Sequence, residues 1–576
     1  MEVQTENKSH IPHRRQLIVL IPFALFYSAA IILGNLEKAR YLGVLRNGAR
    51  FILWTVVSYI VLLVMCSILS QRDVIVSKIP FLSSFPARKS RQGKWYVYVL
   101  FATICLLGYL PYFLMYFPGW LNNDAVWQIE QILGWVEKSN HHPYFHTLIM
   151  KCFFMIGYRL SGTYTGGAAF YTFFQVLVMA MVFAFFLYWL YKRGTRMVWL
   201  VLALAFYAVL PINAILTICM GKDEFFVAAL LFYTWMTIEY NLEEESEPGW
   251  GSPQSVDQEL RRRGILRWIA YFITGLLVCL LRSNGVFIFA GTAFFLMIRR
   301  MKTGRISTKT FPVRTFSCVA AVLLCYLIYQ GPILSALHVE PPDTIEGLTM
   351  PTQHILCAYL KGGELTAEEV DMIDRVVPVD EVGDYYNPWV FDIVKNFIRT
   401  SGNQQVIADN KWEYFKLWLR VGLRNPFQYF VAEVRQTAGY WAYSVQDYEY
   451  VYGEYYMVDN PFGIETRRQF FSYENELVMH KFLMGFQDLY NKVWSLGLNT
   501  WLMVFCVAYM VYNRKNIMVY VPFIMMLITL FMAAPIYNIF RYGYGLFAAY
   551  PILFGYTFGD ERNCTIDTEV TDEKVV

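Results

Sequence analysis

Charged side chains are scarce in this sequence. Lys, Arg, Asp and Glu make up 16% of the 576 residues, and hydrophobic residues make up 56%. A soluble globular chain carries roughly 25% charged residues, so the composition argues against an ordinary soluble domain. The formal net charge of +4 is too small to indicate a nucleic-acid partner, because binding to nucleic acid needs a concentrated basic patch.

Metal-binding and disulfide patterns are also missing. The ten cysteines show no CxxC or CxxH spacing, so the sequence predicts neither a zinc site nor a disulfide framework. Most of them lie inside apolar runs and are expected to act as small buried hydrophobic groups. No small-residue cleavage site follows the apolar stretch 17–33, so we expect a retained signal-anchor helix there. No internal repeat supports the architecture of an inverted-repeat transporter.

Long uncharged runs are abundant. A helix needs about 20 apolar residues to cross the hydrocarbon core of a membrane. About twelve windows meet this requirement, and they are residues 17–34, 51–70, 95–117, 165–191, 197–219, 224–240, 266–281, 284–299, 315–336, 495–512, 517–534 and 541–559. The predicted fold is therefore an all-α polytopic membrane protein.

The basic loops orient these windows. Lys and Arg prefer cytoplasmic loops, and they gather in segments 71–94, 192–196, 241–267, 299–309 and 513–515. If the basic N-terminus is cytoplasmic, all of these segments are cytoplasmic, and only the basic loop 35–50 disagrees. We expect a plasma-membrane protein with both termini in the cytoplasm.

The same alternation predicts the domain organisation. It gives a two-helix membrane segment with a cytoplasmic loop (1–94), a membrane core with an outer loop at 118–164 (95–336), and a mostly helical extracytoplasmic domain (337–494). The last three membrane helices (495–559) and a disordered cytoplasmic tail (560–576) follow.

The outer loop holds an unusual group of polar residues. Asp124 lies seven residues after the end of a predicted span (95–117), and His141, His142 and His146 lie within six residues of one another. A carboxylate at the membrane surface can accept a proton from an attacking hydroxyl, and histidine can do the same or bind phosphate when protonated. Two alternatives remain open: Asp124 as a helix N-cap, and the histidines as a polar turn or as metal ligands.

Three further outer edges carry cations beside helix ends. Lys222 and Asp223 lie in the first, Arg282 and Asn284 in the second, and the third contains Arg541 and Tyr542. Arginine presents a fork that matches phosphate oxygens. Each cation alone is equally well explained by contact with lipid head groups, but idle cations should lie on the cytoplasmic side. Together these residues predict a site for a lipid-borne phosphate at the outer leaflet.

The residues at 117–124 (FPGWLNND) and 140–147 (NHHPYFHT) resemble a bacterial membrane family near the GT-C superfamily of polyprenyl-phosphate-sugar-dependent glycosyltransferases. The resemblance covers roughly residues 95–560 and implies a GT-C-like fold. It also implies an inverting transfer of a sugar from a polyprenyl-phosphate donor to a cell-envelope glycan or lipid acceptor, among membrane lipids and without nucleic acid.

The resemblance further implies roles for these residues. Asp124, with His142 and His146, would be catalytic, while Lys222, Arg282 and Arg541 would hold the phosphate leaving group. His141, Asp223, Asn284 and Tyr542 would complete the substrate site. Two spans precede the Asp-bearing loop where many relatives have one, and the paired acidic motif of the metal-dependent branch is not obvious. We therefore expect no cofactor, with a divalent metal as the less favoured alternative.

Two other functions compete with this one. A transporter or flippase of a lipid-linked or anionic substrate explains the spans and the cations, but transporters need polar groups near the membrane midplane. An outer-face ligase or acyltransferase with a histidine base would use the same loop. In the outer domain, the aromatic and acidic strip 447–456 suits either a sugar ring or an ordinary domain surface.

Overall fold

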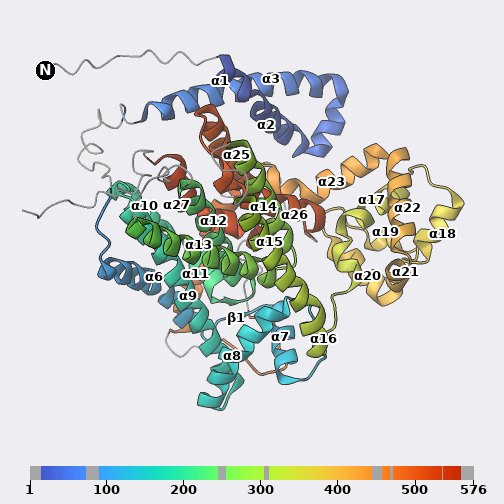
Figure 1. Ribbon diagram of the computed structural model, residues 1–576. Helices are drawn as coiled ribbons and strands as arrows, with labels where there is room; N and C mark the ends of the chain where they lie inside the picture. The colour runs from blue at the N-terminus through green and yellow to red at the C-terminus, as the bar shows by residue number, and fades with distance from the viewer. Residues whose placement is uncertain are drawn as a thin grey trace, which may run out of the picture.

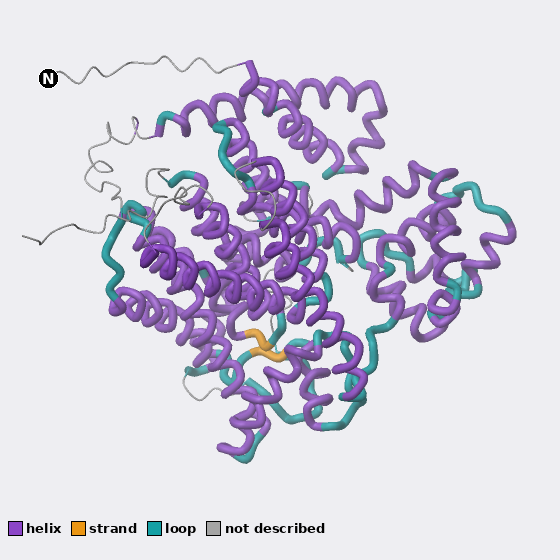
Figure 2. Tube along the Cα trace, viewed as in Figure 1, coloured by secondary structure: helices purple, strands orange, loops and turns teal. Residues whose placement is uncertain are grey.

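Helices make up nearly all of the regular structure in the computed structural model, as Figure 2 shows. The structure describes residues 14–72, 75, 90–243, 254–303, 311–443, 457–466, 471–493, 495–534 and 536–559. Within these residues, the two short strands β1 (Trp120–Leu121) and β2 (Cys219–Met220) form one parallel pair. The predicted tail 560–576 and the strip 447–456 lie outside the described residues.

The helices fall into three sequence regions, coloured in chain order in Figure 1. The N-terminal region contains α1 (Arg14–Val19), α2 (Ile21–Leu33) and α3 (Leu36–Ser70). The central bundle contains α6 (Trp95–Met115), α7 (Asn123–Leu133), α8 (Tyr144–Ser161), α9 (Tyr164–Lys192), α10 (Met197–Val209), α11 (Pro211–Ile218), α12 (Asp223–Glu243), α13 (Gln254–Leu281), α14 (Gly285–Thr303), α15 (Phe311–Ile328) and α16 (Leu334–Ala336).

The C-terminal region begins with a group of short helices and returns to the bundle. The short helices are α17 (Thr349–Leu360), α18 (Ala367–Asp374), α19 (Val382–Tyr385), α20 (Phe391–Ser401), α21 (Gln405–Asp409) and α22 (Lys411–Arg424). They are followed by α23 (Pro426–Trp441), α24 (Tyr473–Val493), α25 (Leu496–Tyr512), α26 (Val521–Ala533) and α27 (Phe540–Thr557).

Five helical stretches in the described part of the chain are long and apolar enough to cross a membrane. They are Arg14–Leu33, Leu42–Ser70, Trp95–Met115, Tyr164–Lys192 and Phe316–Ala336. The pair α10 and α11, bent by 43°, forms a sixth if it is a single broken span. This agrees with an all-α membrane protein, whereas the predicted number of about twelve spans is not established. The apolar stretches at 265–281, 285–299, 496–512 and 518–533 are shorter helices.

The break between α10 and α11 has a local cause. Pro211 is the first residue of α11, and proline has no N–H to continue the helix of the preceding turn. All eight residues of α11 are buried, so this short helix is enclosed by protein. It leads directly into β2, which pairs with β1.

The bundle core allows close helix approach at small residues. A Cβ atom on Gly108 of α6 would lie 2.1 Å from the carbonyl oxygen of Ala208 in α10. Only glycine permits this separation, because any side chain would overlap the neighbouring backbone. Small residues at helix crossings are a common way to bring membrane helices together.

The group of short helices has a core of its own, whose buried side chains run from Ile345 to Val421. In Figure 1 these helices, α17 to α22, lie together at one side of the bundle. The independent core is narrower than the predicted segment 337–494. Helix α23 packs against α25 and α26, and Leu483 of α24 belongs to the core of the main bundle. We call the part with residues 345–421 the small domain.

Candidate functional site

The short strand pair brings together two outer-loop segments that are far apart in the sequence. Trp120 pairs with Cys219, and Leu121 pairs with Met220, in parallel register. The two segments therefore leave their strands in the same direction. Asp124 follows a few residues after the first strand and Lys222 after the second, so their side chains meet just beyond the strand ends.

Asp124 is not the N-cap of α7. The cap is Asn122, whose side-chain oxygen accepts a hydrogen bond of 2.8 Å from the backbone N–H of Ala125. Asp124 lies in the first turn, where the positive end of the helix dipole favours a carboxylate. Its side chain is therefore free of capping duty and available to the cations around it.

Two cations converge on Asp124. The Lys222 ammonium donates to Oδ2 at 2.7 Å, and Nη1 of Arg541 lies 3.4 Å from the same oxygen. The Asp124 side chain is 21% exposed, so these pairs are largely shielded from water while one side of the carboxylate stays reachable.

A second carboxylate continues the network. Nη1 of Arg282 lies 2.5 Å from Oδ1 of Asp223, and Nε of Arg541 lies 4.0 Å from Oδ2 of the same residue. Arg541 thus stands between the two carboxylates. We call Asp124, Lys222, Asp223, Arg282 and Arg541 the ion cluster; three cations against two carboxylates leave one net positive charge on these five groups.

Tyr542 and Asn284 border the ion cluster. The guanidinium of Arg282 lies 4.7 Å from the centre of the Tyr542 ring, and that of Arg541 lies 5.4 Å from it. A cation near an aromatic ring is stabilised by the ring's electron density, so the ring helps to hold both guanidinium groups. Asn284 instead donates to the Thr529 hydroxyl at 2.7 Å and anchors the turn that carries Arg282.

His142 also contacts the ion cluster. Its Nδ1 lies 3.0 Å from the Lys222 ammonium, and its Nε2 lies 3.8 Å from Oδ1 of Asp124. Burial and the adjacent Lys222 charge hold the pKa of His142 well below its usual value. The neutral ring accepts from Lys222 through Nδ1, which leaves Nε2–H directed toward Asp124.

His141 points from this loop to the small domain. Its Nδ1 lies 3.5 Å from Oε1 of Glu346, and its ring centre lies 4.9 Å from that of Trp127. Burial lowers the pKa of His141, although Glu346 opposes this effect. Asn140 holds the same loop by donating to Gln330 at 2.9 Å. His141 therefore connects the loop to the small domain and does not touch the ion cluster carboxylates.

His146 does not join its two neighbours. It lies inside α8 and is fully buried, with Nδ1 3.1 Å from Oε1 of Gln128 and Nε2 2.8 Å from the Tyr171 hydroxyl. Burial lowers the pKa of His146 to about 3, so the ring is neutral. Both nitrogens are used within this polar network, which supports α7 and α8 below the site. These contacts indicate a positioning residue, and the predicted catalytic role receives no geometric support.

The charge state of Asp124 follows from two opposing effects. Burial alone would raise the pKa of this carboxyl, but the positive charges of Lys222 and Arg541 outweigh burial and hold the pKa well below its usual value. Asp124 is thus ionised and a weak base as long as both cations remain beside it. Its proton affinity would increase if an incoming anion drew these cations away.

Sequence reasoning missed two neighbours of the site. Glu224 is 3% exposed, and its Oε2 has no hydrogen-bond partner among the described residues. It follows Asp223 directly, and its adjacency to the turn was the only available signal. Trp127, one helical turn after Asp124, contacts His141 and has its ring centre 5.6 Å from that of His142. Its position on the same face of α7 was the signal for it.

The arrangement is suited to an anionic ligand more than to a metal. Among the residues that the structure describes, no group of three or more His, Cys, Asp or Glu side chains is placed to hold a metal ion. Lys222, Arg282 and Arg541 instead offer several N–H donors within one network. Such a set can bind phosphate oxygens, and Asp124 lies beside it to accept a proton or to orient a hydroxyl.

No curated protein and no solved structure matches the chain. A family of unknown function (DUF6020) matches residues 136–571. The matched region includes the histidine loop, Lys222, Arg282 and Arg541, whereas Asp124 precedes it. Because the match covers well over half of the sequence, the chain belongs to this family of unknown function, DUF6020.

Proposed function

We propose that the protein is a membrane glycosyltransferase that moves a sugar from a polyprenyl-phosphate donor to a cell-envelope acceptor. The ion cluster carries this proposal. It combines an ionised carboxylate with three cations that share two carboxylate partners. A leaving phosphate needs the cations, and an acceptor hydroxyl needs the carboxylate.

The proposed reaction is an inverting substitution at the anomeric carbon. The acceptor oxygen forms the new glycosidic bond as the bond between the anomeric carbon and the phosphate oxygen breaks. The hydroxyl proton passes to Asp124, and the bonding electrons leave with the polyprenyl phosphate. Lys222, Arg282 and Arg541 stabilise the negative charge on that phosphate, which is where electrostatic catalysis is most effective.

The low pKa of Asp124 gives this sequence of events a physical order. In the resting site, Lys222 lies 2.7 Å from the carboxylate and suppresses its basicity. A bound donor phosphate competes for Lys222 and Arg541 and so raises the proton affinity of Asp124. The carboxylate thus becomes a better base when a donor is bound, at the stage where the acceptor hydroxyl must lose its proton.

The architecture that accompanies this proposal is GT-C-like. The shorter apolar helices 265–281, 285–299, 496–512 and 518–533 would join the longer ones as spans, as would α12 and α27. The predicted orientation places both termini in the cytoplasm and the ion cluster on the extracytoplasmic side, where nucleotide sugars are absent. A lipid-carried donor is the natural substrate in that compartment. We propose the metal-independent branch of this chemistry.

Transfer from a panel of radiolabelled polyprenyl-phosphate monosaccharides tests the proposal. Membranes would carry the wild type, Asp124→Asn or Arg282→Ala, with and without a chelator. We expect wild-type membranes to move label to an acceptor and Asp124→Asn to lower the rate roughly 10²-fold to 10⁴-fold, as the loss of a general base does. Activity that survives the chelator would support the metal-independent branch.

Two matched controls separate chemistry from folding. Asp371 and Arg375 form an exposed ion pair in the small domain, with side chains 58% and 64% exposed; Asp371→Asn and Arg375→Ala should therefore leave transfer unchanged. The double variant Asp124→Asn/Lys222→Met removes both charges and should restore the thermal stability lost in Asp124→Asn without restoring transfer. If no donor is consumed, or if Asp124→Asn is as active as the wild type, the catalytic assignment is wrong and transport becomes the better explanation.

A further inference from the structure

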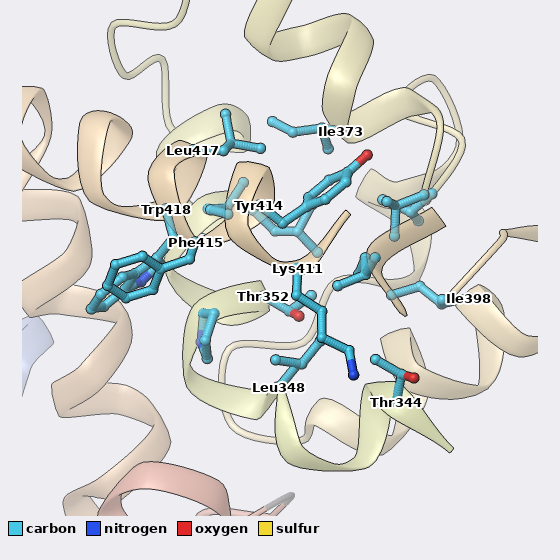
Figure 3. Close-up of a pocket in the computed structure, with 16 residues that line it drawn as sticks. Thr344, Leu348, Thr352, Ile373, Ile398, Lys411, Tyr414, Phe415, Leu417 and Trp418 are labelled. Carbon is cyan, nitrogen blue, oxygen red and sulfur yellow. The ribbon is translucent and has the colours of Figure 1, made fainter. Parts of the chain in front are cut away.

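The small domain contains a cavity that none of the proposed transfer chemistry uses. It has a volume of about 350 Å³, which falls in the range of roughly 300 to 1,000 Å³ of small-molecule sites. It lies among α17, α18, α20, α21 and α22 (Figure 3). Its walls are almost entirely apolar, and many of them belong to the core of the small domain: Leu348, Ile355, Leu356, Ile373, Val376, Val377, Ile398, Ile407 and Leu417.

Two of the polar groups of the lining residues form hydrogen bonds with other protein groups. The Tyr414 hydroxyl donates to the carbonyl of Met372 at 2.7 Å, and the Trp418 indole N–H donates to His354 at 3.3 Å. Both groups are therefore committed to the protein. Lys411, Thr344 and Thr352 also belong to the lining, and Figure 3 draws Lys411 and Thr344 at the same end of the cavity.

Lys411 is the lysine of the small domain that lines the cavity. Lys416 is paired with Glu413 at 2.9 Å, and Lys395 with Glu346 at 3.2 Å. Among the described residues, no acidic side chain lies within ion-pair distance of Lys411, which is exposed and belongs to the cavity lining. An apolar cavity with one cation at its edge is complementary to an apolar chain that ends in an anion.

An exposed apolar stripe on α22 lies beside the cavity. Trp412, Phe415, Leu419 and Leu423 lie on one face of α22 and are 64%, 47%, 46% and 75% exposed. Phe415 belongs both to this stripe and to the cavity lining. An exposed apolar helix face with basic neighbours is typical of contact with a membrane surface. Through Phe415 the stripe adjoins the lining of the cavity.

We propose that the cavity of the small domain binds an anionic single-chain lipid, with the aliphatic chain among the core side chains and the head group at Lys411. The chain would enter along the exposed face of α22. This site is separate from the ion cluster and shares no residue with it, so it stands whether or not the proposed transfer is correct. An aliphatic chain would gain dispersion contacts with these apolar walls without requiring hydrogen bonds.

Photolabelling of the full-length protein in lipid nanodiscs tests this proposal. The probe is palmitic acid with a diazirine on its chain, and labelled peptides are identified by mass spectrometry. We expect saturable labelling of peptides from α17, α18, α20 or α22. Unlabelled palmitate and lysophosphatidate compete as the two sources of an anionic head group, and the stronger competitor identifies the source. Hexadecanol, which lacks the charge, should compete less well.

Matched variants complete the experiment. Lys411→Met should weaken competition by palmitate roughly threefold to tenfold, in line with the loss of one partly exposed ion pair, while competition by hexadecanol stays the same. Lys416→Met, on the same helix but outside the lining, should change neither. Ile355→Trp fills the cavity and should abolish labelling of the small domain, whereas Ile393→Trp at an exposed position outside the cavity should not. Labelling confined to the other helices, or unaffected by Ile355→Trp, would overturn the proposal.

Discussion

The pair formed by Lys222 and Asp124 allows a quantitative test of the ion cluster. The two side chains meet at 2.7 Å and are only 14% and 21% exposed. We consider the variants Lys222→Met and Asp124→Asn, alone and combined. Each single change leaves a charge without its main partner, whereas the double change removes both charges. A double-mutant cycle then isolates the pairwise free energy.

The magnitude follows from burial and from the remaining partner. Breaking a fully buried pair costs roughly 3–5 kcal/mol, whereas exposed pairs are coupled by roughly 0.2–1 kcal/mol. The pair here is mostly buried, but Arg541 stays 3.4 Å from Asp124 and compensates in part for the loss of Lys222. We therefore expect a coupling of roughly 2–3 kcal/mol, between these two limits.

Unfolding by denaturant in mixed micelles, followed by tryptophan fluorescence, gives the free energies. The control cycle uses Arg375→Met and Asp371→Asn, an exposed pair that should be coupled by no more than a few tenths of a kcal/mol. A coupling between Lys222 and Asp124 as small as that of the control pair would show that solvent screens the cluster. The proposed shift in Asp124 basicity on donor binding would then lose its physical basis.

Two further predictions concern the support of the site and the bundle. Because the pKa of His146 falls from 6.5 to about 3 on folding, the unfolded chain takes up a proton first as pH decreases. Stability should therefore fall between these values by up to about 1.4 kcal/mol per pH unit, and His146→Gln should remove this contribution from the measured slope. Gly108→Ala should lower the melting temperature, because its Cβ would lie 2.1 Å from the Ala208 oxygen. Gly48→Ala, with nothing within 4 Å, should preserve or raise it. Equal melting temperatures for both glycine variants would contradict the close approach of α6 and α10.

Hydropathy in the sequence located helices better than it located membrane spans. The apolar windows near 17–34, 51–70, 95–117, 165–191 and 315–336 coincide with helices long enough to cross a membrane. The window 541–559 corresponds to α27, which is buried along most of its length inside the bundle and is counted as a span only in the proposed architecture. A helix surrounded by protein and a helix surrounded by lipid can have the same composition, so hydropathy alone cannot separate these two cases.

The sequence predicted only part of the set of residues that form the site. Alternation of the loops predicted Asp124, Lys222 and Arg541 on the same side of the membrane. In the sequence, however, Lys222 is 98 positions and Arg541 is 417 positions from Asp124. Their contact depends on the β1–β2 pairing, and two-residue strands leave almost no sequence signal. The histidines are close in the sequence but lie in different environments in the structure. Pro143 precedes α8, so His142 stays in the loop, while His146 lies within the helix and turns into the core.

In the proposed function, the ion cluster also gives a reason for carboxylates to accompany the cations that would bind phosphate. Three cations without counter-charges would repel one another and would be costly to hold where they are mostly shielded from water. Asp124 and Asp223 remove most of that repulsion, and Arg541, near both of them, fixes the spacing between Lys222 and Arg282. The donors are thus held in place before a ligand arrives, and no large rearrangement is needed when negative charge develops on it. In the proposed transfer these carboxylates would release part of their hold on the cations, and Asp124, 21% exposed against 6% for Asp223, would be the one to receive a proton. In this arrangement, binding of the leaving group and activation of the base would be consequences of a single exchange of partners.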